Sequence, residues 1–458
     1  MKKFISYIKY IVTFGTLITL GACKKELNLK PFNQIETSTA LLTETDVQST
    51  LIGAYNRAGL PDLYGGGVFL EPDLLTSQTV IDWSGTFQDY TQMVVQQITN
   101  NNAFVNLNWL DAYRVINQCN YVLANLDKVS ANNKNNVEAE AKFLRGLVYF
   151  DLARLFGKAW NDGSPATNLA VPIVLTPTTV VGPDSYPSRS TVAQVYAQAI
   201  ADLTDAETKG STSPSFRANS YSASAILARL YLQQGNYALA ATEASKVIGS
   251  GVYSLVPKYT DEFHFPDLGA VHFDNTTEDV FSIQVTAQQG VNNLNTFYGS
   301  ADFGGRGDIA VKTSFLNEFE AGDLRLLVYN QDSGGSLKVD KFDNLYGNVR
   351  VIRLAELYLI RAESNFRVNG LSATTVTSDV NRIRSRAGLL PLATVTLNQI
   401  LLERRHELAF EGGFFLHDAK RLQQKAGALD WNSPKLVFPI PLIEINANKN
   451  LTQNEGYQ

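Results

Sequence analysis

The chain has 458 residues, of which 45% are hydrophobic and 18% charged, and its formal net charge is −5 at pH 7. This length suits one large globular domain or two closely associated ones. The slight negative charge argues against a nucleic-acid partner, because nucleic-acid-binding domains carry basic surfaces.

The first 22 residues have the pattern of a targeting segment. Lys2 and Lys3 precede the mostly apolar stretch Phe4–Leu20, and the sequence LGAC follows. A basic start, an apolar run and small residues before a cleavage point define a secretory signal. The cysteine at that point is typical of a lipobox, so we predict that 1–22 is a lipoprotein signal peptide and that Cys23 carries lipid. An ordinary cleaved signal or a membrane anchor is the alternative. No other stretch is apolar and long enough to span a membrane.

Helical periodicity dominates the next part of the chain. Cys119, the other cysteine, lies on the apolar side of one such pattern, so we interpret it as a buried small hydrophobe. A Pro/Gly-rich connection with a possible short strand at Val171–Leu175 interrupts the helices. The predicted helices are Glu44–Arg57, Trp109–Leu126, Val137–Phe156 and Thr191–Thr208.

A repeat signal follows these helices. Leu227, Tyr231, Gly235, Tyr237 and Ala240 sit at tetratricopeptide offsets. Small residues let two antiparallel helices approach closely, and such helix pairs bury a continuous core only when they stack. We therefore predict a mainly α fold: a tetratricopeptide-like helical scaffold (an α-α superhelix) with long binding loops and a few short strands, one of them at Val280–Val285.

Two segments lack helical periodicity and are rich in aromatic and polar residues, namely Leu60–Asn108 and Asn292–Asp308. Long loops of this kind in compact domains are usually functional. We expect the two to meet over the scaffold and form the ligand site, the alternative being that their aromatic residues only pack their own loops. The candidate ring-stacking residues are Trp83 and Tyr298, with Tyr90 and Phe297 beside them. The candidate polar contacts are Asp82, Arg306 and Asp308.

The stretch Ile400–Arg421 carries charges on an apolar helical stripe. Thr396 and Gln399 form a capping box at its start, and Gly412-Gly413 is expected to end the helix. Arg404 and Glu411 fall on the apolar stripe, so we predict a buried ion-pair network; a carboxylate pair for acid/base chemistry is the alternative. The expected partners lie on Val351–Arg367, and they are Arg361, Glu356 and Glu363.

Motifs of known enzymes and metal sites are missing from the sequence. It contains no Gly-x-Ser-x-Gly elbow, His-Glu-x-x-His helix or Walker loop. The four histidines show no zinc spacing. Asp332, Asp340 and Asp343 could help hold calcium but lack the twelve-residue loop pattern. We predict no catalytic site, no cofactor and no metal.

The charged block also has a family resemblance. Its sequence ERRHELAFEG resembles the signature of the SusD/RagB family of outer-membrane nutrient-binding lipoproteins, and four further segments agree in the order of that family. They are Ala139–Gly157, Val351–Arg367, Val380–Gly388 and Leu436–Tyr457. The resemblance implies a cell-surface lipoprotein of the outer membrane, attached through its lipid anchor only, that binds an oligosaccharide or another nutrient and delivers it to a SusC-like TonB-dependent transporter.

The resemblance also implies a division of the chain. An N-terminal SusD-like region with tetratricopeptide-like helices would cover 23–250, and a C-terminal SusD/RagB region would cover 251–458, with both interleaved into one globular unit. Three alternatives remain: a peptide-binding RagB-like lipoprotein, a glycan-degrading enzyme, and a helical scaffold that binds only protein. An enzyme of that kind would need two carboxylates flanking a cleft.

Overall fold

The structure is a computed structural model that describes residues 41–457 except 77, 180–181, 183–184, 264–271, 289 and 370–373. The predicted signal peptide and Cys23 lie outside the described residues. Within the described part of the chain, every helix is too short or too polar to cross a membrane.

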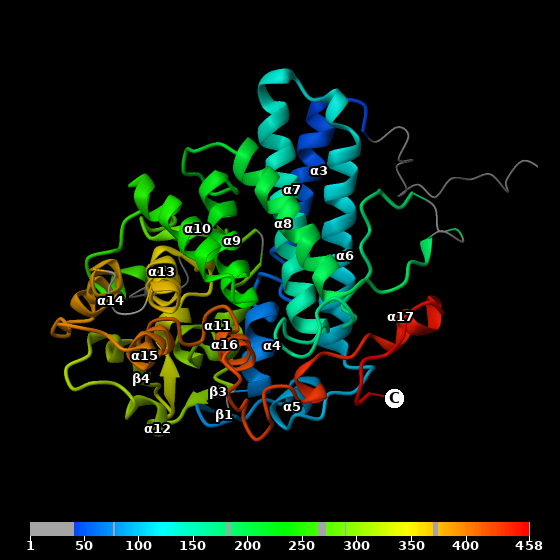
Figure 1. Cartoon of the computed structure of the whole chain (residues 1–458). Helices are drawn as coiled ribbons and strands as arrows, with labels where there is room; N and C mark the ends of the chain where they lie inside the picture. The colour runs from blue at the N-terminus through cyan, green and yellow to red at the C-terminus, as the bar shows by residue number, and fades with distance from the viewer. Residues whose placement is uncertain are drawn as a thin grey trace, which may run out of the picture.

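A stack of helices forms the scaffold (Figure 1). Each helix packs on the next: α3 on α6, α6 on α7, α7 on α8, α8 on α9, α9 on α10, and α10 on α13. The predicted mainly α, tetratricopeptide-like fold is confirmed. The scaffold helices are α3 (Glu44–Ala58), α6 (Ala103–Ala124), α7 (Ala131–Phe156), α8 (Val192–Lys209), α9 (Ser220–Gln234), α10 (Tyr237–Ser250) and α13 (Leu354–Asn369).

Local sequence explains where several helices begin and end. Capping boxes start α3, α8, α9 and α15 (Leu397–Glu407), with Thr43, Thr191, Asn219 and Thr396 as the capping residues. Gly235 ends α9 with φ 71°, a left-handed conformation that glycine adopts without a steric penalty. Asn236 then caps α10. The predicted turn between the two repeat helices is therefore present.

The expectation that Leu60–Asn108 is irregular is wrong. This segment contains α4 (Gly67–Thr76), β1 (Ile81–Trp83) and α5 (Gln88–Val94), and α6 begins within it. Pro72 lies inside α4, where proline normally weakens a helix. Every residue of α4 is nevertheless buried, and the helix packs against α16 (Phe414–Arg421), α5 and α6. Tertiary burial therefore outweighs the local signal of the proline.

Six short strands form three antiparallel pairs in the described residues. Strand β1 pairs with β3 (Ile309–Val311), β2 (Asp279–Ile283) with β6 (Val349–Arg353), and β4 (Tyr329–Gln331) with β5 (Leu337–Val339). Strand β2 matches the predicted strand at Val280–Val285. Val171–Leu175 forms no strand; the nearest pairing is an isolated bridge between Leu169 and Thr191.

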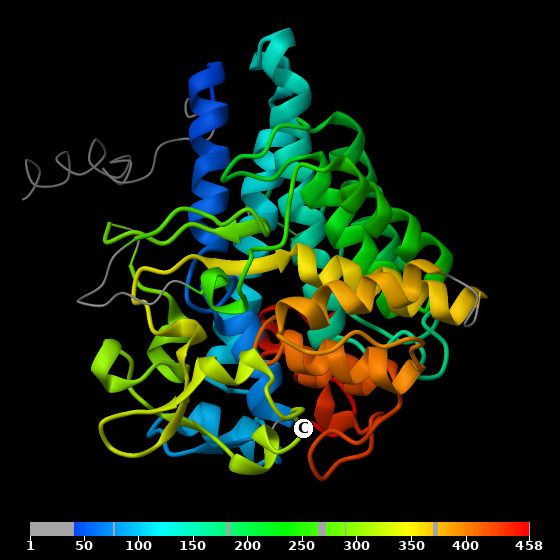
Figure 2. The same ribbon diagram turned by 90° about the vertical axis from the view of Figure 1, so that its left-hand side faces the viewer.

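The remaining helices are shorter than most of the scaffold helices. Figure 2 shows the C-terminal helices beside the scaffold. The remaining α-helices are α11 (Asn293–Tyr298), α12 (Thr313–Leu316), α14 (Thr374–Arg386), α15, α16 and α17 (Leu442–Ala447). The 3₁₀ helices are Leu126–Lys128, Tyr259–Glu262, Ala301–Phe303, Leu324–Val328, Asp340–Phe342 and Pro434–Leu436.

Helix α15 ends earlier than the glycine pair predicts. Its last residue is Glu407, so Glu411 lies in the turn before α16 and not at a helix end. Phe410 takes a positive φ of 67° in this turn. Its ring is buried against Tyr298, Phe315 and Phe415. The helix therefore ends before the turn in which the ring of Phe410 enters the core.

One large hydrophobic cluster joins the scaffold helices to α4, α11, α16 and the strand pairs. A smaller cluster lies among α13, α14 and α15. Cys119 is fully buried in the large cluster, and burial raises the pKa of its thiol to about 12. The thiol is therefore protonated at neutral pH, which agrees with its predicted role as a small buried hydrophobe.

Candidate functional site

The structure brings together the two segments in which the sequence placed the ligand site. Trp83 of β1 pairs with Ile309 of β3, and the backbone N–H of Ser84 donates to the carbonyl of Asp308 at 2.8 Å. Further along, the backbone N–H of Asn293 donates to the carbonyl of Gly65 at 2.9 Å. Both views place this junction at the end of the molecule opposite the upper ends of α3 and α7 (Figures 1 and 2).

Phe87 lies between β1 and α5 and is the most exposed aromatic residue on that side of the junction. It is 39% exposed, and the guanidinium carbon of Arg306 lies 4.9 Å from the centre of its ring. Nε of Arg306 donates to Oδ2 of Asp308 at 2.7 Å. Trp83 is half-buried next to Phe87, and its Nε1 donates to Oγ1 of Thr91 at 3.0 Å. We call Trp83, Phe87, Arg306 and Asp308 the aromatic surface.

Three of the predicted aromatic contacts are instead buried beneath this surface. Tyr298 is 0% exposed, and its hydroxyl donates to Oδ2 of Asp73 at 3.2 Å. Tyr90 stacks on Phe104 with ring centres 3.7 Å apart, and its edge meets Phe297. The assignment of Tyr298, Tyr90 and Phe297 to ligand contact is therefore wrong, because packing and hydrogen bonding inside the core already occupy their rings.

Asp82 lies apart from the aromatic surface. Successive side chains of a strand point to opposite faces. Asp82 accordingly faces solvent while Ile81 is buried, and it lies 3.1 Å from Nζ of Lys312. Of the three predicted polar contacts, the structure pairs Arg306 with Asp308 and leaves Asp82 on the other face of β1.

Phe87 is not among the contact residues that the sequence predicts. The sequence does contain a signal for an exposed ring at this position. Phe87 follows the small and polar residues Ser84-Gly85-Thr86, so it is not part of an apolar helical stripe. Gly85 has a specific role here. A Cβ at this position would lie 2.3 Å from Cζ2 of Trp83, so only glycine lets the indole fold over the loop.

The charged block takes part in a buried network centred on Arg353. Arg353 contacts Glu278, Glu407 and Glu411, each at 2.7 Å. Lys341 also contacts Glu411 at 2.7 Å, and Arg386 pairs with both Glu278 and Glu407. We call these residues the charged network.

The charged network shifts the pKa values of its members. Burial by itself would raise the pKa of Glu407, but Arg386, Arg353 and Arg325 outweigh it and lower the pKa to about 2. Burial lowers the pKa of Lys341 to about 8, although Glu411 acts in the opposite direction. Glu407 therefore stays ionised at neutral pH, as a structural charge surrounded by cations.

The partners expected for Arg404 and Glu411 need correction. Arg404 pairs chiefly with Asp418 at 2.8 Å and approaches Glu356 at 3.5 Å. Glu411 meets Arg353 and Lys341 rather than Arg361. Arg353 is the last residue of β6 and directly precedes α13.

Of the residues expected on α13, Glu356 meets Arg404, whereas Arg361 and Glu363 bind elsewhere. Arg361 pairs with Asp379 of α14 at 2.6 Å, and Glu363 pairs with Arg421 of α16 at 2.7 Å. Glu356 itself forms a bidentate pair with Arg229 of α9, with distances of 2.9 and 2.6 Å. These charges therefore join α13 to three neighbouring helices.

Metal-binding geometry is not found in the described residues, where no three His, Cys, Asp or Glu side chains form a group suited to a metal. The aspartates considered for calcium are occupied by protein donors. Asp332 accepts backbone N–H groups of its own turn, Asp340 accepts from Asn330, and Asp343 accepts the backbone N–H of Ser300 at 2.9 Å.

The helical stack defines a helical-repeat protein, and comparisons with known proteins give its family. A family model described as "Starch-binding associating with outer membrane" matches residues 27–232, and the SusD family model matches residues 332–431. The two models together cover most of the chain, which belongs to the SusD/RagB family.

Individual relatives agree with this assignment. SusD-like protein P25 of Formosa agariphila is 24% identical over 98% of this chain and 100% of its own length. The starch-binding protein SusD of Bacteroides thetaiotaomicron is 25% identical over 75% of this chain and 77% of its own length. A crystal structure of a SusD superfamily protein from Bacteroides thetaiotaomicron, 26% identical, covers 90% of this chain and 100% of that chain with a TM-score of 0.77.

Proposed function

We propose that this protein is a cell-surface lipoprotein that captures an oligosaccharide at the aromatic surface and delivers it to a SusC-like TonB-dependent transporter. The observation that carries the proposal is the exposed ring of Phe87 beside half-buried Trp83, with the guanidinium of Arg306 over the ring and Asp308 next to it. The aromatic ring and the ion pair come from two segments that are far apart in sequence.

The chemistry of this surface suits a sugar. Aromatic rings offer a large, rigid contact area with few torsions to freeze, which suits the apolar face of a sugar ring. The partly exposed guanidinium of Arg306 can donate hydrogen bonds to sugar hydroxyl groups, and the buried carboxylate of Asp308 orients it. The family description and the name of the starch-binding relative support a glycan over a peptide.

We propose binding without turnover and without a cofactor. Glycoside hydrolysis needs two carboxyl groups that flank the scissile bond. On the aromatic surface Asp308 is paired with Arg306, and the carboxylates of the charged network are buried among arginines. The description of the family model and the name of one relative, which both describe starch binding, support the same conclusion.

The membrane attachment is proposed from Cys23 and the signal pattern before it. Acyl chains contribute roughly 0.8 kcal/mol per buried methylene, so several chains make a stable anchor. Cys23→Ala should release the protein from outer membranes, and mass spectrometry of the wild type should find a lipidated N-terminal cysteine. Retention of the variant in washed membranes would contradict the anchor.

Isothermal titration against panels of neutral oligosaccharides, acidic oligosaccharides and peptides tests the binding proposal. A glycan should give saturable heat without product, and Phe87→Ala should weaken its binding at least roughly tenfold, because an aromatic anchor is worth about 2 kcal/mol or more. Phe216→Ala is the matched control, since Phe216 is also exposed but precedes α9 on the scaffold. Phe216→Ala should melt like wild type. Phe87→Ala should melt somewhat lower, because its ring also packs on Tyr90, Phe104 and Phe297, and circular dichroism checks that it is folded at the titration temperature.

Other outcomes of this titration identify the alternatives. Binding of peptides but not glycans would indicate a RagB-like peptide-binding protein, and product formation would indicate an enzyme. Transfer to a transporter is tested by co-expression and co-purification with a SusC-like protein from the same organism. Absence of a complex in mild detergent would contradict the delivery step.

A further inference from the structure

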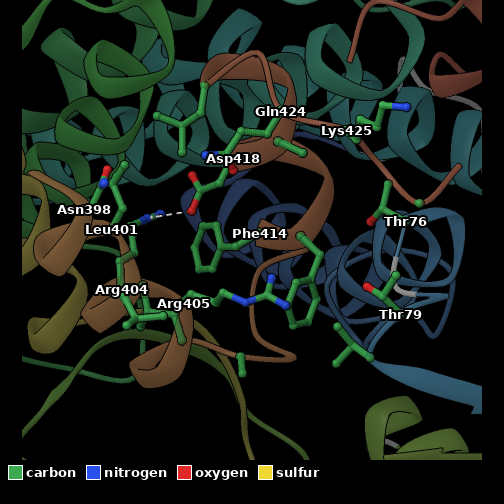
Figure 3. Close-up of a pocket in the computed structure, with 18 residues that line it drawn as sticks. Thr76, Thr79, Asn398, Leu401, Arg404, Arg405, Phe414, Asp418, Gln424 and Lys425 are labelled. Atoms are coloured by element: carbon green, nitrogen blue, oxygen red, sulfur yellow. Dashed lines mark hydrogen bonds and ion pairs between the residues drawn. The ribbon is translucent and has the colours of Figure 1, made fainter. Parts of the chain in front are cut away.

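An open cavity of about 580 Å³ lies beside α15 and α16, away from the four residues of the aromatic surface. Figure 3 shows Asn398 and Leu401 on one side of it, Thr76 and Thr79 on the other, and Phe414 between them. The cavity is therefore bounded by three parts of the chain: α15, α16 with the turns after it, and the end of α4 with the turn before β1.

The floor of the cavity is apolar and firmly held. Leu408, Phe414, Phe415 and Ala419 line it. The guanidinium carbon of Arg404 lies 4.5 Å from the ring centre of Phe414, and its Nε donates to Asp418 at 2.8 Å, as the dashed line in Figure 3 marks. A floor of this kind can take the apolar face of a ring without rearranging.

The rim of the cavity is polar, and its side chains are available. Thr79, Asn398 and Gln424 are exposed, and in the described part of the chain no hydrogen bond engages their hydroxyl or amide groups. Lys425 adds an exposed ammonium group. Hydroxyl, amide and ammonium groups can donate to or accept from sugar hydroxyls in several orientations.

The charges of the cavity are largely compensated. Arg404 is paired with Asp418, and Arg405 is paired with Glu318 at 2.8 Å. Lys425 lies 4.0 Å from Asp430, and both side chains are well exposed to water. A neutral ligand fits this balance better than an anionic one, because two of the three cations already have carboxylate partners at hydrogen-bonding distance.

The cavity adjoins the aromatic surface through β1. Val80 lines the cavity, and Trp83 of the aromatic surface follows three residues later. An extended chain rises about 3.3 Å per residue, so the two positions are about 10 Å apart. Side chains three residues apart point to opposite faces of the chain, so a glycan that reaches both sites must cross an edge of β1. Lys312 holds this segment in place, since its backbone N–H donates to the carbonyl of Val80 and its Nζ to the carbonyl of Gln78.

We propose that the cavity binds one uncharged sugar unit of a glycan whose neighbouring units lie on the aromatic surface. This inference rests on the proposed function and extends it, because it assigns a neutral, extended oligosaccharide as the ligand. Two linked subsites bind a long chain more tightly than either binds a short one, since the second contact is intramolecular.

The test uses isothermal titration with α-1,4-glucan oligosaccharides of increasing length, with β-1,4-glucan, xylan and mannan series in parallel. For the series that binds, affinity of the wild type should rise when the chain is long enough to reach both subsites. Asn398→Ala/Gln424→Ala should lower affinity for the long chains roughly tenfold or more and leave the shortest binding chain unchanged. Both side chains are exposed, so the variant should fold normally.

Asn132→Ala/Asn135→Ala on α7 is the matched control, because these exposed amides lie on a helix that does not line the cavity. A rise in affinity with length that survives Asn398→Ala/Gln424→Ala would overturn the inference, while loss of binding in Phe87→Ala would still support the proposed function. A wild type that binds acidic oligosaccharides but none of the four neutral series would overturn the inference and leave the proposed function standing. A crystal structure with the long chain should show a sugar unit in the cavity beside Asn398 and Gln424, and density confined to Phe87 and Trp83 would exclude the cavity.

Discussion

The charged network and the aromatic surface use similar residue types in opposite ways. In the network, Arg353 is 1% exposed and contacts three carboxylates. On the surface, the side chain of Arg306 is 41% exposed and contacts one carboxylate while it covers the ring of Phe87. Arginine therefore joins distant parts of the fold in the first region and stays accessible to a ligand in the second.

Burial explains the difference between the two regions. Breaking a buried ion pair leaves an uncompensated charge in a medium that solvates it poorly, and it typically costs 3–5 kcal/mol. An exposed pair typically contributes at most about 1 kcal/mol, because water replaces the lost partner. Replacing the partly exposed Arg306 should therefore cost less folding free energy than replacing Arg353, although its partner Asp308 is itself buried.

Replacing Arg353 gives the largest expected effect. Arg353→Met should lower the free energy of unfolding by roughly 3–5 kcal/mol, because Glu278, Glu407 and Glu411 lose their shared partner. Urea denaturation measures the change. Arg405→Met is the control, since its pair with Glu318 is about one-third exposed and should contribute at most about 1 kcal/mol. Equal losses in both variants would remove the distinction between buried and exposed pairs.

Acid should act on the charged network through Glu407. Its pKa is about 2 in the folded protein against an ordinary value of 4.5. Because the folded-state pKa is the lower one, the carboxylate contributes stability above pH 4.5 that is lost as the pH falls towards 2. Each pKa unit corresponds to 1.36 kcal/mol, so this group should account for about 3 kcal/mol.

Unfolding by urea at several acidic pH values measures this loss. Glu407→Gln should be less stable at neutral pH and show a shallower decline in acid, and Glu455→Gln at an exposed position near the C-terminus is the control. A decline in Glu407→Gln as steep as that of wild type would show that other carboxylates cause it.

Gly85→Ala should disturb the aromatic surface through packing. Its Cβ would lie 2.3 Å from the ring of Trp83, so the indole must move. Overpacking of this kind costs about 1–3 kcal/mol, and glycan binding should weaken as well. Tryptophan fluorescence and urea denaturation report the change. Gly249→Ala is the control, since nothing lies within 4 Å of a Cβ there. An unchanged spectrum and affinity would show that Trp83 does not depend on the glycine.

Trp83→Phe should have the smallest effect. It removes the Nε1 hydrogen bond to Thr91 but keeps an aromatic ring, so it should lower the free energy of unfolding by about 1 kcal/mol and leave glycan affinity close to that of wild type. Thr91→Val should cost a similar amount, and the double variant should cost less than the sum of the two. Fully additive losses would show that this hydrogen bond contributes nothing.

Much of the scaffold was predictable because its signals are local. Thr191 and Thr396 cap their helices from three residues away, Gly235 ends α9, and alternation around Val280 marks β2. The candidate site was predictable only in part. Its two segments could be recognised by composition, but Tyr298 resembles an exposed ligand contact in sequence and is buried in the structure.

The sequence by itself determined the helical repeats, their capping residues and the family signature, because these depend on residues within a few positions of one another. The tertiary structure alone decided that α4 stays helical around Pro72, that Phe87 is exposed above Tyr90, and that Glu411 pairs with Arg353. Each of these depends on burial or on a partner far along the chain: Glu411 and Arg353 are 58 residues apart. Burial and Coulomb energies depend on distance in space, which no local pattern of residues encodes.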